Sequence, residues 1–170
     1  GCGDGDLTEL LAERFERVIA VDHSPQRLAR ARTRVPAAHV EFHAGELDSL
    51  PIGDAAADAI FLSLVLHHVP ELDAALREAF RVLRAGGRLV AADLAPHGEE
   101  WAREVMGDLR LGLERSSLER ALGAAGFRAV RFLPARDRLA ARGRRSLELY
   151  LATAQRPADA ATRSRRKETR

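Results

Sequence analysis

The sequence predicts an α/β domain of three layers, in which helices cover both faces of a mostly parallel sheet. Apolar segments of strand length alternate with segments of helical periodicity over residues 1–125, and two further strand-like segments follow within residues 127–154. Strands that alternate with helices are typical of a parallel sheet. The terminal pair of consecutive strands predicts one antiparallel edge strand.

The first part of the chain contains two helix–strand pairs after a glycine-rich turn. Apolar residues at helical spacing predict a helix over about residues 8–16, and an apolar segment predicts a buried strand over residues 18–22. Ser24-Pro25 is typical of a helix start, because serine caps the first turn and proline is preset for the first helical position. The next strand is expected at residues 40–43.

The second part repeats this alternation and then changes. Residues 45–58 are expected to form a loop, and Gly86-Gly87 is expected to end the helix that contains Leu72 and Leu76. The strands expected there are residues 59–64, 88–93, 127–133 and 147–154, and the later helices are residues 99–106 and 117–125.

A glycine-rich turn and a carboxylate at a strand end predict a site for a nucleoside-bearing cofactor. Glycine occupies positions 1, 3 and 5, where the missing Cβ lets the backbone approach a ligand. Asp22 ends the following strand, 17 residues after Gly5. A carboxylate in that place can accept hydrogen bonds from both hydroxyls of a ribose.

Two acids beside the turn favour one class of cofactor over another. A dinucleotide fingerprint that starts at Gly1 requires glycine at position 6, where the chain has Asp6, and Asp4 adds a second carboxylate. A helix start attracts pyrophosphate, but carboxylates repel it. S-adenosylmethionine has a ribose, a sulfonium and an ammonium group and no phosphate, so the acids fit it better.

Four motifs in register resemble class I S-adenosylmethionine-dependent methyltransferases, in particular type 11-like methyltransferase domains. The motifs are Gly1-Cys2-Gly3-Asp4-Gly5, Val18-Ile19-Ala20-Val21-Asp22, Gly45-Glu46-Leu47 with Leu50-Pro51, and Val82-Leu83-Arg84-Ala85-Gly86-Gly87-Arg88-Leu89-Val90. The resemblance implies a Rossmann-like methyltransferase fold with S-adenosyl-L-methionine as cofactor. It also implies a central strand before the glycine-rich turn, so we expect the chain to be an N-terminally truncated fragment.

Two later segments resemble a narrower group, the methyltransferase half of fusions with a winged-helix, arsenic-repressor-type regulator. They are residues 62–69 and residues 96–112, which include Pro96-His97 and Leu111-Gly112. In such a fusion the contact with nucleic acid belongs to the upstream domain. We therefore expect this chain to contact a small-molecule acceptor and no nucleic acid of its own.

The resemblance assigns cofactor contacts to residues in the turns and at the strand ends. Glu46 stands where the family often has an aspartate that bonds the adenine amino group, so either this longer side chain or the backbone of Glu46-Leu47 makes the contact. Ser63 and Leu64 end a strand and are expected to line the cofactor. The full set is Gly1, Gly3, Gly5, Asp22, His23, Glu46, Leu47, Ser63 and Leu64.

Catalytic side chains are optional for this reaction, because the sulfonium of the cofactor already activates the methyl group. His67 and His68 are weak candidates for a general base, since a neutral imidazole can deprotonate an acceptor. We favour a structural role for them at the transition from strand to helix. No third ligand at a metal-binding spacing is identifiable, so no metal is expected.

Residues of the variable segment are the expected acceptor contacts. Loops over strand ends carry specificity on rigid scaffolds. The candidates are His97, Glu100, Trp101, Asp108 and Arg110. Trp101 has an alternative role in packing between helices.

The composition favours one domain and a separate tail. A length of 170 residues with 46% hydrophobic content suffices for one core. Cys2 is the single cysteine, and neither a long apolar run nor a signal peptide is recognisable, so we expect a cytoplasmic protein that contacts no membrane. Residues 156–170 carry a formal charge of +4 and residues 1–155 carry −2, which together give the net charge of +2. We therefore expect a domain over residues 1–155 followed by a basic disordered tail.

Three rival functions stay open on the sequence. A quinone-type C-methyltransferase shares the expected fold. A noncatalytic sensor of S-adenosylmethionine would bind the cofactor without turnover. A nicotinamide oxidoreductase is disfavoured by Asp4 and Asp6.

Overall fold

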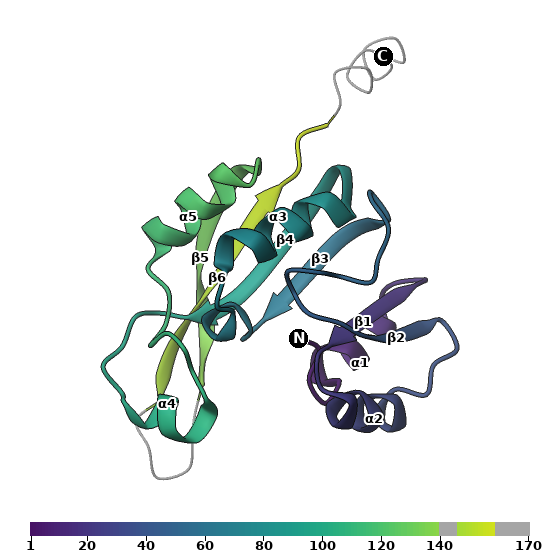
Figure 1. The fold of residues 1–170 in the computed structure, drawn as a ribbon, viewed down its shortest axis with the longest axis horizontal. Coiled ribbons are helices and arrows are strands. Elements are labelled where there is room, and N and C mark those ends of the chain that lie inside the picture. The colour runs from purple at the N-terminus through teal and green to yellow at the C-terminus, as the bar shows by residue number, and fades with distance from the viewer. Residues whose placement is uncertain (140–145, 159–170) are drawn as a thin grey trace. The chain divides into compact units, whose positions relative to one another are not determined.

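The computed structural model describes residues 1–139 and 146–158, which divide into two compact units, Gly1–Pro51 and Ile52–Arg170 (Figure 1). The described strands form two separate sheets, β1-β2 in the first unit and β3-β4-β6-β5 in the second. One domain with one sheet was expected, so the structure divides the expected domain after Pro51. None of the helices in the described ranges has the length and apolarity needed to cross a lipid bilayer.

The first unit has two helices and a parallel strand pair. Its elements are α1 (Asp6–Ala12), β1 (Val18–Asp22), α2 (Pro25–Arg34) and β2 (Val40–Ala44). The expected strands and the second helix are confirmed, and the Ser24 hydroxyl accepts from the Arg27 amide at 3.3 Å as the predicted cap. The first helix ends four residues earlier than expected. Phe15, which was counted on its apolar face, lies beyond the helix and is 41% exposed.

The second unit contains the larger sheet. Its elements are β3 (Ala57–Ser63), the 3-10 helix η1 (Leu66–His68), α3 (Leu72–Val82), β4 (Leu83–Leu94), α4 (Trp101–Met106), α5 (Arg115–Ala124), β5 (Arg128–Leu139) and β6 (Leu147–Gln155). Helices α3 and α5 lie side by side on this unit, with the rings of Phe80 and Phe127 in edge contact at 5.2 Å (Figure 1). Strand β5 continues six residues beyond its expected end at residue 133, and residues 140–145 lie outside the described residues.

The α/β class with mostly parallel strands is confirmed, but the antiparallel strand is not at the edge of the sheet. β3 and β4 are parallel, whereas β6 is antiparallel to both of its neighbours, β4 and β5. The edge strand is β5, which carries Arg128, Arg131 and Pro134. Arginine and proline are tolerated at an edge, because charges and a missing amide donor discourage further pairing.

The junction between α3 and β4 also differs from the prediction. The helix ends at Val82 rather than at Gly86-Gly87, and β4 begins with the next residue. Ala57 pairs with Leu83, but Ala59 pairs with Arg88, so the register shifts across the glycines. Gly86 has a φ of +82°, and a Cβ on Gly87 would lie 2.8 Å from the Arg84 carbonyl oxygen. The glycines therefore shape an irregular start of the strand.

Arg156 belongs to the folded unit, so the expected tail boundary is wrong at its first residue. Its guanidinium donates to the carbonyl oxygens of Phe80 and Leu83, both at 2.7 Å, and stacks over the Phe80 ring at 4.6 Å. The last carbonyls of a helix lack partners within the helix, and arginine can satisfy them. Residues 159–170 lie outside the described residues, so the disordered tail stays a prediction.

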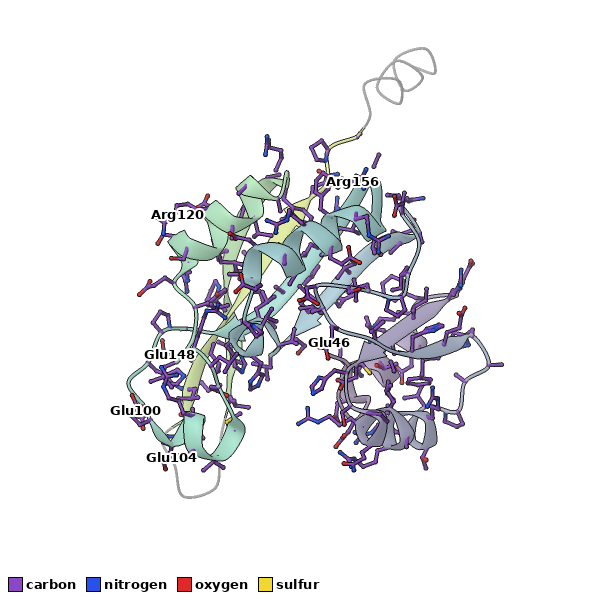
Figure 2. The ribbon with its side chains drawn as sticks, viewed as in Figure 1. Glu46, Glu100, Glu104, Arg120, Glu148 and Arg156 are labelled. Atoms are coloured by element: carbon purple, nitrogen blue, oxygen red, sulfur yellow. The ribbon has the colours of Figure 1, made fainter. Side chains whose placement is uncertain are left out.

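Replacing Arg156 should destabilise the second unit. Arg156→Ala removes charge-assisted hydrogen bonds at the end of α3 and should lower the free energy of unfolding by about 1.5–3 kcal/mol, measured by urea denaturation. Arg120→Ala is the matched control, because Arg120 lies on α5 (Figure 2) and its guanidinium donates to the Ser117 hydroxyl one turn away rather than to the end of α3. Equal unfolding midpoints for the two variants would show that Arg156 does not stabilise the second unit and belongs with the tail.

Candidate functional site

The glycine-rich turn is closed against α2 and runs beside β1. The Cys2 amide donates to the Val21 carbonyl oxygen at 2.8 Å. Gly3 and Gly5 have φ values of +56° and +91°, which only glycine adopts readily. A Cβ on the buried Gly5 would lie 3.2 Å from Ala31. The sequence-predicted turn therefore depends on glycine for both its conformation and its packing.

Asp22 holds this turn together at the carboxyl end of β1. One carboxylate oxygen accepts from the Gly3 amide at 2.8 Å, and the other accepts from the Ser24 amide at 2.9 Å. The residue is only 2% exposed. A carboxylate offers about four acceptor positions, so Asp22 retains capacity for hydroxyl donors of a ligand. The sequence predicted the binding role but not this structural one.

The electrostatic surroundings keep Asp22 ionised. Burial by itself raises the pKa of this carboxyl, but the amide donors of Ser24 and Gly3 lower it, and the net pKa lies below its ordinary value. His23 adds a smaller favourable charge interaction, with its Nδ1 3.7 Å from the Asp22 carboxylate. Asp22 is therefore an anion at neutral pH.

The acids in the turn are paired with arginines of α2. Asp4 lies 2.9 Å from Arg30, and Asp6 lies 2.5 Å from Arg34. Paired charges repel an approaching phosphate less than free ones do. Asp4 and Asp6 therefore disfavour a pyrophosphate-bearing cofactor less strongly than their charges alone predicted.

The loop after β2 is anchored beside Asp22. The Gly45 amide donates to the Asp22 backbone carbonyl at 3.2 Å, and a Cβ on Gly45 would lie 2.6 Å from the Pro51 ring. Glu46 follows as an exposed side chain (Figure 2). Because β1 and β2 are parallel, their carboxyl ends meet at one edge. The first unit brings these predicted residues to that edge: Gly1, Gly3, Gly5, Asp22, His23, Glu46 and Leu47.

Ser63 and Leu64 lie in the second unit, at the carboxyl end of β3. The Leu64 amide donates to the Ala92 carbonyl oxygen at 2.8 Å, and Leu64 has a φ of +51°. A positive φ is uncommon for leucine and marks backbone strain. The strained residue turns the chain from β3 into η1, which carries the two histidines.

His67 is buried against a carboxylate that the sequence did not single out. Its Nδ1 lies 2.6 Å from an oxygen of Asp93, and the two residues are 1% and 0% exposed. Asp93 also accepts from the Leu66 and Leu94 amides, both within 2.9 Å. The structural role favoured for His67 agrees with this placement. A carboxylate at the end of an apolar strand was the available signal for Asp93.

His68 is half-buried and lies on the other side of a second buried acid, Asp108. The His68 Nδ1 donates to the Gly107 carbonyl oxygen at 3.2 Å, and burial lowers the pKa of His68. Asp108 is 3% exposed, and its carboxylate has no hydrogen-bond partner among the described residues. Asp108 therefore faces the histidines and not an open acceptor surface.

The remaining acceptor candidates serve different local contacts. Trp101 is 8% exposed in a core cluster with Leu94 of β4 and Leu147 of β6, so it packs against strand residues and not between helices as the alternative role had it. Arg110 donates to the carbonyl oxygens of Val69 and Pro70 and thereby ties its loop to the segment after η1. Glu100 is exposed and pairs with Arg103 at 3.3 Å (Figure 2), and His97 Nδ1 accepts from the Glu99 amide at 3.3 Å. Acceptor contact by this set stays a prediction.

The comparison with protein families decides the assignment. The model of the family described as methyltransferase domain matches residues 1–91, which is more than half of the chain. The chain belongs to this family. The cofactor of the domain is S-adenosyl-L-methionine, and the carboxylate capacity at Asp22 and the glycine-lined turn fit the ribose and the methionine portion of that cofactor.

Individual relatives agree with the assignment. The chain is 40% identical to malonyl-[acyl-carrier protein] O-methyltransferase of Serratia marcescens over 106 residues, which are 59% of this chain and 41% of that protein. It is 36% identical over 93 residues to the ubiquinone/menaquinone biosynthesis C-methyltransferase UbiE of Rubrivivax gelatinosus, covering 55% of this chain and 37% of that one. The chain thus spans well under half the length of these relatives.

The fold is also that of solved methyltransferases. The N-methyltransferase NodS of Bradyrhizobium japonicum, crystallised with S-adenosyl-L-homocysteine, superimposes with a TM-score of 0.70 at 20% identity. The superposition covers 92% of this chain and 75% of NodS. The Rossmann-like methyltransferase fold expected from the sequence is confirmed.

The two histidines should differ in their effect on stability. His67→Ala removes one of the three donors of the buried Asp93 carboxylate and should lower the free energy of unfolding by about 1.5–3 kcal/mol. His68→Ala removes one hydrogen bond from a half-exposed side chain and should cost about 1 kcal/mol. Both values are measured by urea denaturation in the presence of a chelator. Equal losses for the two variants would contradict the asymmetric burial.

The contribution of Asp22 to stability should depend on pH in a defined direction. Because its folded-state pKa is lowered, the carboxylate stabilises the fold above its ordinary pKa of about 3.9, and this contribution is lost as pH falls through the lowered value. The difference in unfolding free energy between wild type and Asp22→Asn should stay constant from about pH 8 to 5 and narrow below about pH 4. Asp48→Asn, at an exposed position, is the control. Narrowing between pH 7 and 5 would contradict the lowered pKa.

Proposed function

We propose that this domain transfers a methyl group from S-adenosyl-L-methionine to a small-molecule acceptor. The observation that carries the proposal is the buried, ionised carboxylate of Asp22, which lies beside a glycine-rich turn and has acceptor positions to spare. Family membership supports S-adenosylmethionine-dependent methylation as the reaction class. The acceptor and the individual residue roles are part of the proposal.

Each residue at the edge of the β1-β2 pair has a binding task in this proposal. Asp22 accepts the two ribose hydroxyls, and Gly3 and Gly5 lie under the methionine portion, where a side chain would collide. Glu46, or the backbone of Glu46-Leu47, contacts the adenine amino group. The bound cofactor supplies a methyl group already activated by its sulfonium, so the protein contributes orientation and exclusion of water.

The acceptor atom distinguishes the two enzymatic readings. The similar proteins named above are an O-methyltransferase and a quinone C-methyltransferase, so similarity at this level spans oxygen and carbon acceptors. The second candidate function is therefore quinone-type C-methylation, favoured by the likeness to UbiE. In a longer protein the same domain can form one part of a regulator, with nucleic acid bound by another part.

Replacing Asp22 tests the cofactor site directly. Asp22→Ala should weaken S-adenosylhomocysteine binding at least about tenfold, because it removes charge-assisted hydrogen bonds worth roughly 1.5–3 kcal/mol each. Asp22→Asn should be intermediate, since one oxygen remains to accept. Ser24→Ala is the matched control: it removes the hydroxyl cap of the same turn and leaves the amide that bonds Asp22.

Calorimetry and circular dichroism separate binding from folding. Besides removing ribose contacts, Asp22→Ala leaves the Gly3 and Ser24 amides without their acceptor, so it is expected to lower the stability of the turn as well. Affinity is therefore compared only between variants with native spectra. Wild-type affinity in a folded Asp22 variant, or binding of NADH in place of S-adenosylhomocysteine, would remove the cofactor assignment.

Turnover is measured separately, as S-adenosylhomocysteine released with carboxylic acids, quinols and thiols as acceptors. Release with one class identifies the class of acceptor, and the mass and NMR spectra of the methylated product identify the acceptor atom. Cofactor binding without release for any acceptor would support a noncatalytic sensor.

A further inference from the structure

We propose that His67, His68 and Asp108 form a binding site for a divalent transition-metal ion, of which zinc is the best match. One ligand atom from each residue lies within 4.8 Å of the other two. Asp108 Oδ1 lies 3.6 Å from His67 Nε2 and 3.8 Å from His68 Nε2. The sequence did not reveal this cluster, because Asp108 joins the histidines only through the fold.

The hydrogen bonds of the histidines use Nδ1 in both rings and leave each Nε2 toward Asp108. His67 Nδ1 contacts the Asp93 carboxylate, and His68 Nδ1 contacts the Gly107 carbonyl oxygen. An ionised carboxylate and a carbonyl can only accept, so each Nδ1 carries the proton. In a neutral imidazole Nε2 is then a lone-pair donor, which is the form that binds metals.

The cluster buries polar atoms that have no hydrogen-bond partner among the described residues. Within the described part of the chain, His67 Nε2 and both Asp108 oxygens are buried without a hydrogen-bond partner. Asp108 is 3% exposed and His67 is 1% exposed, so bulk water does not solvate them. Burying an unpaired carboxylate is costly unless a cation compensates its charge. A metal ion at the centre would pair with all three groups at once.

The outer contacts match those of protein zinc sites. Histidine ligands of zinc usually donate their second nitrogen to a carboxylate or a backbone carbonyl, which fixes the ring and raises its basicity. Asp93 supplies this contact to His67, and Asp93 is itself held by the Leu66 and Leu94 amides. The Gly107 carbonyl supplies it to His68.

The donor set and the spacing select the class of ion. Two imidazole nitrogens and one carboxylate oxygen suit zinc and its neighbours, whereas magnesium and calcium prefer oxygen alone. Bond lengths of about 2.0–2.1 Å place neighbouring ligands about 3.3 Å apart in a tetrahedron. The observed 3.6 and 3.8 Å between each Nε2 and Asp108 Oδ1 lie close to that separation, and the three ligand atoms lie within 4.8 Å of one another.

The site would keep one coordination position open. Three protein ligands with a fourth position for water are typical of zinc sites that bind a further ligand. The side chain of His68 is 37% exposed, whereas those of its two partners are 1% exposed or less. The open position therefore lies on the His68 side, within reach of water or a small oxygen, nitrogen or sulfur ligand.

Zinc binding by the full chain tests the proposal without any measurement of methyl transfer. Protein freed of metal by a chelator is titrated with Zn²⁺ in competition with a chromophoric chelator, and we expect one ion per chain. Asp108→Asn and His68→Gln should each lower the affinity at least about tenfold, the lower limit known for changes in the outer contacts of zinc sites. Asp93→Asn should lower it about 10- to 100-fold.

His39→Gln is the matched control, because His39 is exposed in the first unit and contacts a backbone carbonyl oxygen, that of Ala12. It should bind zinc like the wild type. If Asp108→Asn fails to fold, His68→Gln decides, since its side chain is half-exposed. Cobalt bound to the wild type should give the intense visible bands of a four-coordinate site.

Two results would overturn the proposal. One is wild-type zinc affinity in folded His68→Gln. The other is an imidazole nitrogen NMR spectrum in which both His67 nitrogens stay protonated in the presence of zinc, which would make His67 a cation held between Asp93 and Asp108. Loss of methyl transfer with intact zinc binding would count against the proposed function alone.

Discussion

A buried carboxylate at the carboxyl end of a parallel strand holds the functional loops in both units. Asp22 ends β1 and accepts from the Gly3 and Ser24 amides, while Asp93, near the end of β4, accepts from the Leu66 and Leu94 amides and from His67. A buried charge is tolerated only when several donors surround it. Each carboxylate therefore requires the neighbouring backbone to adopt one conformation.

The buried carboxylate has a different role in each unit. Asp22 uses two of its acceptor positions for the protein and leaves the rest toward a ligand, so positioning and binding are tasks of one group. Asp93 is completely buried and bonds only protein donors among the described residues, so its effect on a ligand passes through His67. In both units the buried carboxylate at the strand end fixes the conformation of the backbone segments that donate to it.

Local signals predicted most elements, and long-range contacts account for the errors. Ser24-Pro25 predicted the start of α2, and the glycine-rich turn with Asp22 predicted the edge of the first unit, because these signals act within a few residues or one strand. To place β6 between β4 and β5, one must know which of the last two strands, β5 or β6, is the more buried. The periodicity of their sequences does not give this information. The pairing of Asp93 with His67 and the reach of Arg156 to α3 depend on segments distant in the chain.

The order of synthesis gives the position of β6 a consequence for the nascent chain. β6 pairs with β4 on one side and β5 on the other, although it is made after both. Until residues 147–155 leave the ribosome, β4 has an unpaired edge and the apolar side chains that β6 covers are open to water. Unpaired edges of this kind promote association between chains. The pairing that joins β4 to β5 is therefore the last step in closing this sheet during synthesis, because it requires residues 147–155.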